Sequence, residues 1–164
     1  MARTTLQADL AERQVILTRD FNAPRELVFR AFTESEALAR WWGPHGFKTE
    51  IVENQPQAGG SYHFVMRDAE GNAYPVQGKY TEVSPPSRLV ITWAAASQAD
   101  DPKAYSRVTF EIVPYEDMVK LTVTHDELEP GSGMDTGIRQ GWPIVLSSLK
   151  SLLETGKGLD VFAK

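Results

Sequence analysis

The chain has no cysteine among its 164 residues. Disulfides, thiolate metal sites and cysteine nucleophiles are therefore excluded, and the composition is compatible with a reducing compartment. Long apolar runs are also missing. No stretch approaches the roughly 18 residues that a membrane-spanning helix needs, and the first residues lack the apolar segment of a signal peptide. We therefore expect a cytoplasmic protein without a membrane span.

Positive charge is scarce as well. The 17 basic residues are outnumbered by 22 acidic ones, which gives a net charge of −5. Because no cluster of lysines and arginines offers a stripe for phosphates, we expect neither nucleic acid nor an anionic membrane as a partner.

Recognisable cofactor motifs are absent too. The three histidines, at positions 45, 63 and 125, are too far apart for a metal-binding pair, so no metal site is expected. The glycines at 131, 133 and 137 mimic a dinucleotide fingerprint, but their spacing is wrong and too little chain follows for the parallel strands such a site needs. We therefore expect no cofactor.

The first third of the chain predicts one strand and two short helices. Residues 14–21 are rich in β-branched side chains and alternate as a strand does. Pro24 suits the first position of a helix, whose apolar stripe is Leu27, Val28, Ala31 and Phe32. Residues 33–36 read as a capping box for a second helix, which ends near Trp41 and is terminated by residues 43–44.

Alternating strands linked by short turns follow, and one long amphipathic helix closes the chain. The strands predict an antiparallel meander with one apolar face. The helix carries its apolar residues at Ile138, Trp142, Leu146, Leu149 and Leu153. Pro143 lies within this pattern and leaves two interpretations open, a hinge in the helix or a helix that starts there. We favour the hinge.

These elements predict an α+β fold. A curved antiparallel sheet of about seven strands wraps the long C-terminal helix, with two short helices between strands 1 and 2. The expected organisation is an N-terminal extension over residues 1–13, a single domain over 14–158 and a tail over 159–164.

Five segments, in this order and spacing, resemble a known superfamily. They are Phe21-Asn-Ala-Pro24, Arg40-Trp-Trp-Gly-Pro44, residues 59–67, residues 78–93 and Gly141-Trp142. Together they resemble the START-like superfamily (SRPBCC, helix-grip, birch-pollen-allergen-like), and within it the homologues of the activator of the heat-shock-protein-90 ATPase. The resemblance implies a cavity between sheet and helix that often binds a ligand and is sometimes catalytic. It also implies that the protein forms a homodimer, as members of the family frequently do.

An inward-facing set of aromatic side chains is the candidate lining of such a cavity. By strand parity and helix phase this set comprises Tyr62, Phe64, Tyr80, Trp93, Phe110 and Trp142. The same residues would equally serve as core packing, and both interpretations stay open. Gly78 shares their face and is expected to leave space there.

Two further features complete the candidate site. Trp41 and Trp42 are consecutive on a helix end, so one should pack inward and the other remain exposed at the rim as an anchor for a ligand or a protein; Trp41 is the candidate. His125 is expected to face inward as a polar anchor, and Glu127 shares its parity, which makes the two residues weak acid/base candidates.

The leading hypothesis is a protein that binds an apolar or aromatic small molecule without transforming it. The first alternative is an enzyme with cyclase- or hydrolase-like chemistry in the same cavity. The second is a chaperone cofactor or another protein-interaction module.

Overall fold

The computed structural model describes residues 13–42, 46–98, 100–128 and 133–156, with residues 133–135 described by their backbone alone. Its strands form one antiparallel sheet in the order β1-β7-β6-β5-β4-β3-β2. They are β1 (Val15–Phe21), β2 (Lys48–Asn54), β3 (Ser61–Arg67), β4 (Ala73–Ser84), β5 (Arg88–Ala95), β6 (Ser106–Tyr115) and β7 (Met118–Asp126). The expected meander of seven strands is confirmed.

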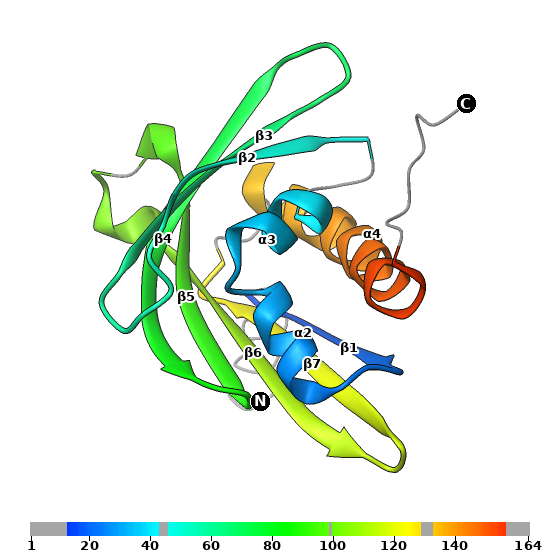
Figure 1. The fold of residues 1–164 in the computed structure, drawn as a ribbon. Coiled ribbons are helices and arrows are strands. Elements are labelled where there is room, and N and C mark those ends of the chain that lie inside the picture. Colours follow the sequence, from blue (N-terminus) through cyan, green and yellow to red (C-terminus); the bar gives the residue numbers. More distant parts are fainter. Residues whose placement is uncertain (1–12, 43–45, 99, 129–132, 157–164) are drawn as a thin grey trace, which may run out of the picture.

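Three α-helices lie on the concave side of this sheet (Figure 1). The helices α2 (Arg25–Ala31) and α3 (Ser35–Trp41) connect β1 to β2, and α4 (Gly133–Thr155) follows β7. Helix α2 contacts β6, α3 contacts β2 and α4 contacts β1. This arrangement confirms the predicted α+β fold. No described helix is long and apolar enough to cross a membrane.

The two short helices differ in detail from the prediction. Leu27 is 38% exposed, and the buried residues of α2 include Phe29 instead. The prediction of a capping box over residues 33–36 is wrong, because the N-cap residue of α3 is Glu34 and its side chain makes no capping hydrogen bond. The Thr33 hydroxyl instead bonds the backbone carbonyls of Phe29 and Arg30. Serine and threonine often make such bonds to the preceding turn.

Both tryptophans at the end of α3 are buried, so the prediction that one of them remains exposed at the rim is wrong. Trp41 is 2% and Trp42 is 5% exposed. The helix ends at Trp41, and Trp42 already has an extended backbone (φ −69°, ψ 133°). Successive side chains in a helix point about 100° apart, but this constraint no longer applies once the chain leaves the helix. The two residues predicted to terminate α3, at 43 and 44, lie outside the described residues.

Gly78 leaves no free space on the inner face, contrary to expectation. A Cβ atom at this position would lie 2.0 Å from the carbonyl oxygen of Thr92 on β5. That oxygen also accepts a hydrogen bond from the Tyr62 hydroxyl. The backbone amide of Lys79 bonds to the Thr92 hydroxyl at 2.9 Å. The absent side chain therefore permits a close approach of the two strands.

Pro143 lies inside α4, ten residues after its start at Gly133. The interpretation that the helix starts at this proline is therefore wrong. Proline cannot donate to the carbonyl four residues earlier, so one bond of the helical ladder is missing. The Pro143 carbonyl accepts a hydrogen bond from the Ser147 hydroxyl at 2.9 Å.

Candidate functional site

A cavity of about 790 Å³ lies between the sheet and the N-terminal half of α4. Its wall is mostly apolar, and charged residues stand at its mouth. Buried wall residues include Trp42, Val76, Ser106, Leu128, Ile138, Trp142 and Val145. Exposed residues at the mouth are Gln98, Asp101, Lys103 and Glu127. An apolar cavity with a few polar groups is the usual form of a small-molecule site.

The predicted aromatic set divides between this cavity and the core. Trp93 and Trp142 line the cavity, and Trp42 lines it where Trp41 was the candidate. Trp41 packs edge-on against Phe32, and its indole N–H donates to the backbone carbonyl of Ala31 at 2.8 Å. The remaining four are buried and are not among the lining residues. They are Tyr62, Phe64, Tyr80 and Phe110.

Three tryptophans form one side of the cavity. The rings of Trp42 and Trp93 stack with centroids 5.3 Å apart and an angle of 26°. Trp142 meets Trp42 edge-on at 6.1 Å. The buried indole N–H of Trp42 has no hydrogen-bond partner among the described residues. An unpaired buried donor is unusual in a folded protein. A bound ligand that accepts this hydrogen bond would explain it.

His125 is fully buried behind this wall and bonds two residues that line the cavity. Its Nε2 lies 2.7 Å from the Ser106 hydroxyl oxygen. Its Nδ1 accepts a hydrogen bond from the indole N–H of Trp142 at 3.1 Å. The Ser106 hydroxyl in turn donates to the backbone carbonyl of Trp93 at 3.2 Å. His125 itself is not among the residues that line the cavity.

This network fixes the tautomer of His125. An indole N–H can only donate, so Nδ1 must be unprotonated and the ring proton is on Nε2. Burial lowers the pKa of His125 to about 3, with a small opposing effect from Asp126. The ring is therefore neutral at pH 7, and its Nε2 cannot take a proton from Ser106. The network resembles a serine–histidine pair but lacks the free base that nucleophilic catalysis requires.

The second acid/base candidate, Glu127, stands at the mouth of the cavity. It follows the end of β7 and has a left-handed backbone (φ 59°), and its side chain is exposed. Strand parity therefore does not determine the direction of the Glu127 side chain. Both ring nitrogens of His125 are occupied by other residues, so a His125–Glu127 dyad does not form. Asp126 points outward and pairs with Arg107 at 2.6 Å.

Sequence reasoning missed Ser106, the buried polar residue of the wall. A signal existed, because Ser106 shares strand parity with the inward residues Val108 and Phe110. A polar residue at an inward position is informative in its own right. Met66 carried the same signal, because it shares strand parity with Tyr62 and Phe64. The contribution of the loop at Ala104 had no comparable signal, since it depends on how distant segments meet.

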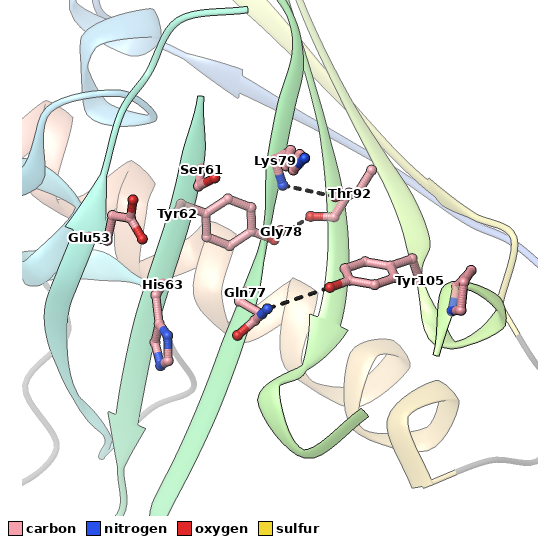
Figure 2. Close-up of a pocket in the computed structure, with 10 residues that line it drawn as sticks. Glu53, Ser61, Tyr62, His63, Gln77, Gly78, Lys79, Thr92 and Tyr105 are labelled. Carbon is pink, nitrogen blue, oxygen red and sulfur yellow. Dashed lines mark hydrogen bonds between the residues drawn. The ribbon is translucent and has the colours of Figure 1, made fainter. Parts of the chain in front are cut away.

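A second hollow, of about 490 Å³, lies on the outer face of β2 to β5 (Figure 2). Polar side chains line it, including Glu53, His63 and Lys79. Gln77 bonds the hydroxyl of Tyr105 across it at 3.5 Å. Its polar lining makes it a poorer candidate than the inner cavity for a small-molecule site.

A family profile matches most of the chain. The profile described as Activator of Hsp90 ATPase homolog 1-like protein matches residues 22–154. The chain belongs to this family. The predicted membership in the START-like superfamily is thereby confirmed, in the branch that the sequence resembled. No curated protein matches the chain.

Solved structures of similar fold come from several bacteria. A protein from Chromobacterium violaceum is 26% identical with a TM-score of 0.76, and the match covers 86% of this chain and 97% of that one. The AHSA1 protein from Silicibacter pomeroyi is 28% identical with a TM-score of 0.73, covering 85% and 96%. The Aha1 dimer from Colwellia psychrerythraea is 20% identical with a TM-score of 0.70, covering 88% and 98%. At 20% identity, the likeness to the Colwellia psychrerythraea protein shows the fold alone.

Proposed function

We propose that this member of the Activator of Hsp90 ATPase homolog 1-like family binds an apolar or aromatic small molecule in the cavity between its sheet and α4. The observation that carries the proposal is the cavity of about 790 Å³ with its wall of three tryptophans. Planar aromatic walls favour ring-bearing ligands, because stacked or edge-on ring pairs add to the energy of apolar burial.

Gly137 offers a way to close the cavity without disturbing the core. It lies in α4 and lines the cavity, and no heavy atom lies within 4 Å of a Cβ atom built on it. A phenylalanine here should extend into the open space. The helix should not suffer, because glycine is the poorer helix former. We expect Gly137→Phe to lower ligand affinity tenfold or more while the protein stays folded.

The matched control is Gln140→Phe, an exposed position of the same helix that does not line the cavity. Binding can be followed by tryptophan fluorescence against a panel of lipids, fatty acids and polyketides. Three of the four tryptophans line the cavity and should respond. If no ligand of the panel binds, or if both variants bind as the unmodified protein does, the proposal is wrong.

A chaperone-cofactor role is the second candidate, because the matching family is described as Activator of Hsp90 ATPase homolog 1-like protein. The burial of Trp41 and Trp42 removes the exposed aromatic anchor that the sequence suggested for such a role. A chaperone ATPase assay with purified protein tests it. An unchanged ATPase rate would exclude activation of that chaperone.

We also propose a homodimer in the cytoplasm. The dimer is supported by the similar fold of the Aha1 dimer from Colwellia psychrerythraea. Light scattering tests it, since a mass near 18.3 kDa would show a monomer. The cytoplasmic location is the expectation from the sequence and stays a prediction.

A further inference from the structure

Ser106 is a buried polar residue in the wall of the cavity. Among the described residues the buried polar side chains are Ser106, at 3% exposed, and His125, at 0%. Of these two, only Ser106 lines the cavity. Its hydroxyl is held by His125 Nε2 at 2.7 Å and by the Trp93 carbonyl at 3.2 Å. A buried polar group among tryptophans is well placed to discriminate between ligands of similar shape.

The hydrogen bonds around Ser106 run in one direction only. The Trp142 indole N–H must donate to His125 Nδ1, so the proton of the ring is on Nε2. That proton is donated to the Ser106 oxygen. The single hydroxyl proton of Ser106 is then donated to the Trp93 carbonyl. A hydroxyl oxygen has two lone pairs, and His125 uses one of them. Ser106 therefore has one remaining acceptor site and no free donor.

We infer that the cavity selects ligands that carry a hydroxyl group on an apolar or aromatic body, with this hydroxyl donating to the Ser106 oxygen. The inference rests on the proposed function, since it names the class of ligand for the same cavity. A hydroxyl fits better than an N–H because it also accepts. The wall contains a donor without a partner among the described residues, the indole N–H of Trp42.

A pair of naphthalene probes of similar shape tests this selection. The first is 2-naphthol, which donates a hydrogen bond, and the second is its methyl ether, 2-methoxynaphthalene, which cannot. Equilibrium dialysis gives both dissociation constants without relying on fluorescence. One net hydrogen bond should favour 2-naphthol by about threefold to tenfold. If the ether binds the unmodified protein as tightly as 2-naphthol, the inference is wrong while the proposed function stands.

Two substitutions assign the preference to Ser106. Ser106→Ala should bind both probes with equal affinity, because the acceptor is gone while the apolar wall remains. Ser106→Thr keeps the hydroxyl and should keep the preference for 2-naphthol. A preference that persists in a folded Ser106→Ala variant would overturn the inference. If neither probe binds the unmodified protein, the proposed function fails and the inference fails with it. The comparison of probes in the unmodified protein decides the matter even where a variant does not fold.

Discussion

Trp142 on α4 donates its indole N–H to Nδ1 of His125 on β7, over a distance of 3.1 Å. Both side chains are buried, at 4% and 0% exposed. The bond joins the long helix to the sheet and at the same time sets the protonation of the histidine. One contact thus couples the packing of α4 to the polarity of the cavity wall.

Trp142→Ala should lower the free energy of unfolding by about 3 kcal/mol, near the lower end for the truncation of a large core side chain. The lower end applies because Trp142 borders a cavity, so part of its surface has no packing partner. The loss of the bond to His125 adds to the cost, since a buried acceptor is left unpaired. Urea melts measure the change.

Gln98→Ala is the control for this prediction. Gln98 is exposed, in the short 3₁₀ turn η1 (Ala96–Gln98), where substitutions usually stay within about 0.5 kcal/mol. Equal midpoints for Trp142→Ala and Gln98→Ala would contradict the assigned role of Trp142. They would equally contradict its place on the cavity wall.

Stability should fall as the pH is lowered below neutrality because of His125. Burial lowers its pKa from 6.5 to about 3 in the folded protein. Between these values the unfolded chain binds a proton that the folded protein does not, so acid favours unfolding. The contribution is complete above pH 6.5 and is lost progressively toward pH 3. We expect a loss of about 2 kcal/mol between pH 7 and pH 5 from this residue.

Urea melts at a series of pH values measure the slope, with His125→Gln compared against the unmodified protein. Asp126 is the acidic neighbour that acts on His125, and it stays in place in this variant. His63→Gln, on the outer face of β3, serves as the histidine control. The steep slope should disappear in His125→Gln and persist in His63→Gln. A slope that is the same in all three proteins would show that His125 does not titrate as described.

Most of the fold could be predicted from the sequence because the strands and α4 have one buried face each. Apolar and polar residues alternate along β6 and β7, and apolar residues recur every three or four positions in α4. Both patterns indicate directly which face is buried. The end of α3 could not be predicted in the same way. Whether Trp42 faces inward depends on the residue at which the helix stops, and at this point one residue changes the direction of a side chain.

The cavity was harder to predict than the fold. Strand parity shows that Phe110 and Trp93 share a face, but it does not show which of them meets the helix and which borders a space. That division depends on where α4 and the loop around Ala104 lie above the sheet. The Ser106–His125–Trp142 network joins β6, β7 and α4, so no local pattern contains it.

Pro143→Ala should raise the free energy of unfolding by about 1 kcal/mol or more. The alanine supplies the backbone N–H that proline lacks in the helix interior, and it has the higher helix propensity. Packing losses should be small because Pro143 is only partly buried. Thermal melts give the shift. A destabilised variant would indicate that the proline is matched to a bend in α4 and would favour the hinge interpretation.

The last prediction compares alanine at Gly78 with alanine at Gly137. At Gly78 the new Cβ atom would lie 2.0 Å from the oxygen and 2.7 Å from the carbon of the Thr92 carbonyl. These are backbone atoms of a paired strand and cannot move away as a side chain would. The φ angle of Gly78 is not in the left-handed region, so the effect is steric alone. We expect a loss of about 3 kcal/mol or failure to fold.

At Gly137 nothing lies within 4 Å and the residue is helical, so alanine should stabilise the protein by about 0.5–1 kcal/mol. Urea melts of both variants make the comparison, and similar stabilities would mean that β4 and β5 do not approach each other as closely as described.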